Sequence, residues 1–70
     1  MDNTYIQFID TLIELRHIKK MTQHDLANAC NLPQSSIARI ESKKSIPQLN
    51  TLLKILNTLN CELKIIPKNN

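Results

Sequence analysis

The sequence contains no glycine and no tryptophan, and its 70 residues include only one Phe and one Tyr. Without glycine, every tight turn has to be made by residues such as Asn, Ser, Lys or Pro. With so few aromatic residues, the core has to be built chiefly from Ile and Leu, which suits a bundle of helices. A chain of this length buries only about 60% of the surface that it exposes when unfolded. We therefore expect one small, mainly α-helical domain that spans residues 1–70.

The residue types that metal sites and catalytic sites need are also scarce. Cys30 and Cys61, with two distant His, are too few for a metal site and form no recognisable disulfide framework. The sequence shows no nucleophile–base set, no paired carboxylates and no glycine-rich phosphate loop, so we expect neither an enzyme nor a cofactor. It also shows no signal peptide and no apolar run of membrane-spanning length. These features predict a cytoplasmic protein with two reduced thiols, no metal and no membrane association.

The segment from Thr22 to Lys44 has the pattern of two short helices joined by a tight turn. Thr22 is a typical N-cap, and Asn31 tolerates the left-handed backbone that ends a helix. Pro33 suits the start of the next helix. The inward positions are apolar at helical spacing: Leu26, Ala27, Cys30, Leu32, Ile37 and Ile40. The segment therefore predicts a helix-turn-helix at about residues 22–41, and a generic helical hairpin is the alternative.

The flanking segments predict two more helices and one short strand. Thr4 to about Lys19 has a broad apolar face, with Ile6 and Ile13 off its centre as extra core or as a partner surface. Gln48 to Leu59 carries a core stripe of Leu49, Leu52, Leu53, Leu56 and Leu59, with Ile55 flanking. After Asn60, a second plausible helix-ending Asn, the alternation from Cys61 to Ile66 predicts a strand. Because we find no second strand, we predict that this one pairs with its copy in a homodimer, through Glu62, Leu63, Lys64, Ile65 and Ile66.

Several stretches together resemble the Cro/cI-type (XRE) helix-turn-helix family of bacterial and phage DNA-binding proteins. They are Leu15-Arg16, Thr22 to Ala27, Ser35 to Glu41, and Ile46-Pro47 through Leu52 to Leu56. The resemblance implies a lambda-repressor-like fold of four to five helices. The final segment, a helix ending in Leu-Asn that runs into a strand, is similar to HipB-type antitoxins, in which the strand pairs across a dimer. The sequence departs from the family at Asn31, where Gly is usual, and at Lys43, where Gly is common.

The resemblance also implies how the domain would contact DNA. It places the helix from Gln34 to Glu41 in the major groove, with its first turn near the bases. The outer face of that helix carries residue types that pair with base edges, so we assign base readout to Gln34, Ser35, Ser36 and Arg39. We assign phosphate contacts to the start of the preceding helix and to the following loop, through Thr22, Gln23, Lys43 and Lys44. For the two lysines, a merely solvated loop is the alternative.

Two further positions are implied to be structural rather than DNA-contacting. In the resembled family the positions of Arg16 and Glu41 form a partly buried ion pair that ties the first helix to the end of the third. His17 and His24 have no catalytic arrangement around them, and His24 is expected at the surface.

These features together predict a sequence-specific DNA-binding transcriptional repressor, a homodimer that binds a palindromic double-stranded operator. The HipB-like ending adds a second role, as the antitoxin of an operon that it autoregulates, with a kinase-like toxin as partner. One alternative is a stand-alone phage or mobile-element repressor. Another is a protein-interaction module that uses this fold without DNA. The polar outer face of the second helix and the two lysines after it favour DNA over that last alternative.

Overall fold

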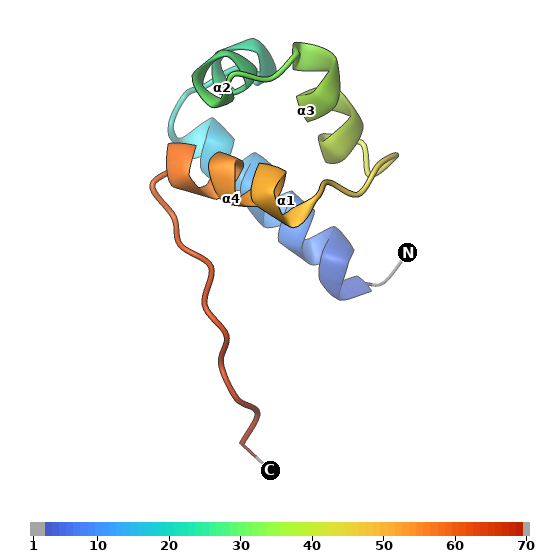
Figure 1. Cartoon of the computed structure of the whole chain (residues 1–70), viewed down its shortest axis with the longest axis vertical. Helices are drawn as coiled ribbons and strands as arrows, with labels where there is room; N and C mark the ends of the chain where they lie inside the picture. Colours follow the sequence, from blue (N-terminus) through green and yellow to red (C-terminus); the bar gives the residue numbers. More distant parts are fainter. Residues whose placement is uncertain (1–2, 70) are drawn as a thin grey trace.

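The computed structural model describes residues 3–69, and the folded part of this range consists of four α-helices (Figure 1). These are α1 (Asn3–Ile18), α2 (Gln23–Cys30), α3 (Gln34–Glu41) and α4 (Leu49–Thr58). The prediction of a mainly helical domain is confirmed, with four helices in the described range. The expected bounds of α4 were one residue too wide at each end, because Gln48 and Leu59 cap this helix. None of the described helices is both long enough and apolar enough to cross a membrane.

The core forms where side chains from all four helices meet. Its buried apolar residues are Ile9, Leu12, Leu26, Ala27, Cys30, Ile37, Ile40, Ile55, Leu56 and Leu59. The three largest fully buried side chains are Ile9, Ile37 and Leu59, so aliphatic residues fill the centre as the composition requires. Full burial of one such side chain contributes about 1.5–3 kcal/mol to folding. This core holds α2 and α3 in the relative orientation of a helix-turn-helix.

The apolar stripe predicted on α4 was wrong at two of its positions. Leu49 and Leu53 are 60% and 44% exposed, whereas Ile55, predicted only to flank the stripe, is buried. The apolar residues of α4 extend around more of the helix than the core can cover. Sequence spacing alone cannot show which part of such a broad face turns inward. The outcome is an apolar strip on α4, formed by Leu49 and Leu53, that is left partly exposed.

All four described helices end in the same backbone arrangement, although the chain has no glycine. The residues just past the helix ends have positive φ: Lys20 (56°), Asn31 (58°), Lys43 (65°) and Asn60 (60°). After each of them, an N–H bonds back over five residues, as Leu32 N does to Ala27 O at 2.8 Å. This is the Schellman motif, in which glycine is the usual residue. The predicted left-handed turns at Asn31 and Asn60 are confirmed, whereas the two lysines in this conformation were not predicted.

Residues 61–69 leave the helical body as an extended tail (Figure 1). The described residues contain no β-strand, so the strand predicted from Glu62 to Ile66 is not formed within this single chain. Ile65 and Ile66 are 96% and 80% exposed. A strand exists only when its backbone groups bond to a neighbouring strand, and residues 3–69 of one copy offer none. Pairing with a second copy therefore stays a prediction.

Candidate nucleic-acid interface

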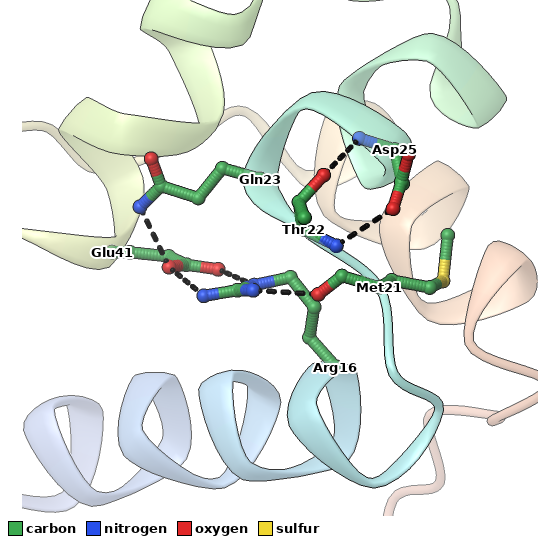
Figure 2. Close-up of polar contacts among 6 residues, drawn as sticks. All are labelled: Arg16, Met21, Thr22, Gln23, Asp25 and Glu41. Carbon is green, nitrogen blue, oxygen red and sulfur yellow. Dashed lines mark hydrogen bonds and ion pairs between the residues drawn. The ribbon is translucent and has the colours of Figure 1, made fainter.

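The first turn of α2 is closed by a capping box (Figure 2). The Thr22 hydroxyl accepts a hydrogen bond from Asp25 N at 3.0 Å, and the Asp25 carboxylate accepts one from Thr22 N at 2.9 Å. These bonds to the backbone and side chain of Thr22 lower the pKa of Asp25. The prediction that Thr22 is the N-cap is confirmed. The role of Asp25 was missed, although an acidic residue three positions after a Thr cap is a recognisable signal.

The capping box limits how the start of α2 could bind an anion. The Asp25 carboxylate already faces the positive end of the helix dipole and satisfies one backbone donor. The backbone N–H groups of Gln23 and His24 are the donors left for a phosphate. The Thr22 hydroxyl accepts one bond and can still donate its own proton. The donors that the cap leaves for the phosphate contacts predicted at Thr22 and Gln23 are thus the Thr22 hydroxyl and the backbone N–H groups at the start of α2.

Arg16 and Glu41, implied to form an ion pair, lie in direct contact (Figure 2). Arg16 Nε is 2.7 Å from Glu41 Oε2, and Arg16 Nη2 is 2.9 Å from Oε1. Arg16 Nη1 donates a third bond to Met21 O at 2.7 Å. Among the described residues, Arg16 is the one charged side chain that is buried, at 7% exposure. Such a two-pronged contact fixes the guanidinium and the carboxylate in one geometry, and so joins the end of α1 to the end of α3.

The charge state of Glu41 follows from this network. Burial raises the pKa of its carboxyl, but hydrogen bonds from Arg16 and Gln23 and the positive charge of Arg16 outweigh this effect. The net result is a pKa below the ordinary glutamate value. Glu41 is therefore ionised at neutral pH, so both of its hydrogen bonds with Arg16 join two charged groups.

Gln23 extends this network in a way that the sequence did not predict. Its Nε2 donates a hydrogen bond of 2.9 Å to Glu41 Oε1, so the first residue of α2 is bonded to the last residue of α3 (Figure 2). Arg16 then links both helices to α1 through the same carboxylate. One N–H of the Gln23 amide is engaged inside the domain, so the second N–H of Nε2 and the backbone N–H are the donors left for a phosphate contact at this position. The side chain also holds the two helices of the motif together.

The residues predicted to read bases lie on the outer face of α3. Gln34, Ser35 and Arg39 are exposed, and Ser36 is half-buried. The opposite face carries Ile37 and Ile40, both in the core, so the outer face cannot turn inward. Within the part of the chain that the structure describes, no hydrogen bond engages the side chains of the four residues assigned to base readout. Their donors and acceptors are therefore available to a ligand at the surface.

The two lysines that follow α3 differ in their surroundings. Lys43 Nζ pairs with Asp10 Oδ1 of α1 at 2.5 Å, across 33 positions of sequence. Lys44 is exposed, and none of the ion pairs within residues 3–69 includes it. The predicted phosphate contact of Lys44 thus has an available ammonium group. Lys43 is half-buried against α1, a placement that no local sequence signal indicates.

The fold and the site define a helix-turn-helix domain, with a core-packed α2 and an α3 whose polar face is open. Residues 12–66 match the helix-turn-helix family HTH_3, and the chain therefore belongs to this Cro/C1-type (XRE) family. A relative from Haemophilus influenzae strain Rd, named "Uncharacterized HTH-type transcriptional regulator", is 38% identical over 65 residues. The matched part is 93% of this chain and 66% of the relative, so the chain spans about two thirds of that protein's length. No solved structure gives a significant match.

Proposed function

We propose that this protein is a sequence-specific DNA-binding transcriptional repressor in which α3 is the recognition helix. The observation that carries the proposal is the outer face of α3, where Gln34, Ser35 and Arg39 are exposed and unengaged while the opposite face is fixed in the core. Gln pairs with adenine, Arg with guanine, and Ser with either base. The family match and the name of the relative support a role in transcription. The proposal assigns the protein no catalysis and no cofactor.

Phosphate contacts would hold α3 in place over the bases. Lys44 lies three residues after the end of α3, and the free backbone N–H groups at the start of α2 lie in the same helix-turn-helix motif. Contacts of this kind carry no sequence information but fix the orientation of the protein on the duplex. Each also makes the affinity for DNA fall as salt concentration rises. The proposed interface thus consists of base-contacting residues on α3 and of phosphate-contacting groups before and after this helix.

A homodimer is part of the proposal, because two recognition helices about 34 Å apart are needed to read a palindromic site. The support lies in the tail, where apolar and charged residues alternate from Cys61 to Ile65. Leu63 and Ile65 are exposed, and the described backbone of residues 62–69 makes no hydrogen bond within the chain. Antiparallel pairing with a second tail would satisfy those groups and cover those side chains.

The proposal includes a role as the antitoxin of a HipB-like operon, supported by the likeness of the helix-to-tail segment near Leu59 and Asn60 to such proteins. Co-expression with the product of the neighbouring gene tests this part separately. A stable complex with a kinase-like protein, and relief of its toxicity, is the expected result. A chain that represses its operon but binds no such product is instead a stand-alone regulator.

The test of DNA readout compares a base-reading residue with a phosphate anchor. Selection from a random duplex library identifies the preferred site, and affinities are then measured at matched salt. Arg39→Ala should weaken binding to that site by about 1–3 kcal/mol and relax the preference at one base position per half-site. The control Lys44→Ala should weaken binding on all sequences alike and reduce the salt slope by about 1. A wild-type protein that enriches no sequence contradicts the proposal.

A further inference from the structure

The loop after α3 holds its two lysines on a fixed backbone. Lys43 N bonds to Ile40 O at 3.0 Å, and Lys44 N bonds to Arg39 O, also at 3.0 Å. Lys43 sits at positive φ, a position that favours glycine, yet the chain places a long cationic side chain there. The backbone of both residues is thus bonded in place, whereas their side chains have different surroundings. Lys44 extends into solvent, whereas Lys43 lies against α1.

The partner of Lys43 on α1 is an exposed carboxylate. Asp10 Oδ1 contacts Lys43 Nζ, and the two side chains are 57% and 29% exposed respectively. An ammonium group donates charge-assisted hydrogen bonds to carboxylate oxygens and to phosphate oxygens, since both are anionic acceptors. Asp10 therefore occupies Lys43 in the way that a DNA phosphate would. A contact this exposed adds little to stability, so folding of the domain does not depend on it.

We propose that Asp10 is an intramolecular competitor for DNA phosphate at Lys43, and so sets the affinity of the interface below what its lysines could supply. The inference rests on the proposed DNA binding, because it concerns the anchor beside the recognition helix. While Lys43 stays with Asp10, Lys44 alone anchors this loop. A phosphate that approaches Lys43 is repelled by the Asp10 carboxylate, so Lys43 gains from the phosphate only the difference between two similar contacts, or a contact weakened by this repulsion. Neutralising Asp10 releases Lys43 as a second anchor.

The probe is a duplex of arbitrary mixed sequence, because phosphate contacts do not depend on base sequence. Binding of full-length Asp10→Asn is followed by fluorescence anisotropy over a range of salt concentrations. Glu14→Gln is the matched control. Glu14 is exposed one turn after Asp10 on α1, and its substitution removes the same charge without changing the contact of Lys43. Lys43→Ala and the double variant complete a double-mutant cycle. Thermal unfolding of each variant shows that it is folded under the conditions of the assay.

Asp10→Asn should bind about two- to fivefold more tightly than Glu14→Gln, the range that corresponds to the strength of one exposed ion pair. Its salt slope should be steeper by about 0.9, for one added phosphate contact. Adding Lys43→Ala to Asp10→Asn should abolish the difference. Equal gains in Asp10→Asn and Glu14→Gln, or a gain that survives Lys43→Ala, overturn the inference while leaving DNA binding intact. If neither wild type nor any variant binds the duplex at low salt, the proposed function itself fails, and this inference with it.

Discussion

Replacing Arg16 with Met removes three hydrogen bonds from the junction of α1, α2 and α3. Two of them go to Glu41, whose side chain is only 11% exposed, so the variant leaves a nearly buried carboxylate with a single bond from Gln23. Breaking one half of a buried ion pair costs about 3–5 kcal/mol. A domain of 70 residues has a total stability of roughly 4–10 kcal/mol. We therefore expect Arg16→Met to lose a large part of its stability.

The assay is urea unfolding at neutral pH, followed by circular dichroism, for a double-mutant cycle. Arg16→Met with Glu41→Leu should recover much of the loss, because no charge is then left unpaired. Recovery should be incomplete, since Gln23 Nε2 and Met21 O also lose their partner. Arg16→Lys is the control that keeps the charge but not the two-pronged geometry, and it should lose less. Losses that simply add in the double variant would refute the reasoning, because they would mean that the two side chains do not interact.

Three further predictions concern stability and assembly. Within the described residues the hydroxyl of Tyr5 is buried without a hydrogen-bond partner, so Tyr5→Phe should leave the free energy of unfolding unchanged or raise it by about 1 kcal/mol; a clear loss in urea unfolding would reveal an unseen partner. Glu41 has a pKa below its ordinary value of 4.5, so its contribution should be complete above that pH and lost as pH falls through the folded-state pKa. Glu41→Gln should therefore flatten, but not abolish, the acid loss, because the lowered pKa of Asp25 adds to it. Deleting residues 61–70 should give a monomer with much weaker operator binding; a full-length protein that stays monomeric at micromolar concentration in sedimentation excludes pairing through the tail.

The helix-turn-helix could be predicted because its signals lie close together in the sequence. The cap at Thr22, the left-handed turn at Asn31 and the inward residues of α2 and α3 each depend on neighbours a few positions away. Local hydrogen bonds and helical spacing fix such features before any tertiary packing is considered. The outer face of α3 could be predicted for the same reason, since it is what remains when Ile37 and Ile40 face the core.

Contacts between distant segments could not be predicted in this way. The bonds from Gln23 to Glu41 and from Lys43 to Asp10 join residues 18 and 33 positions apart, and each depends on how the helices cross. Of the long-range contacts, the pair of Arg16 with Glu41 could be anticipated only through the family resemblance. The inward face of α4 was misassigned for a related reason. Its apolar residues offer two possible core faces, and packing against α2 decided between them.

The four helix ends without glycine also bear on the unfolded state. A lysine in the left-handed conformation is disfavoured by about 1–2 kcal/mol, so the turns at Lys20 and Lys43 work against folding. Glycine would relieve that strain, but it would also give the unfolded chain more backbone freedom to lose. A chain with no glycine at all begins folding from a more restricted ensemble. The turns at Lys20 and Lys43 are therefore strained in the native state, while the entropy that folding removes from the rest of the backbone is smaller.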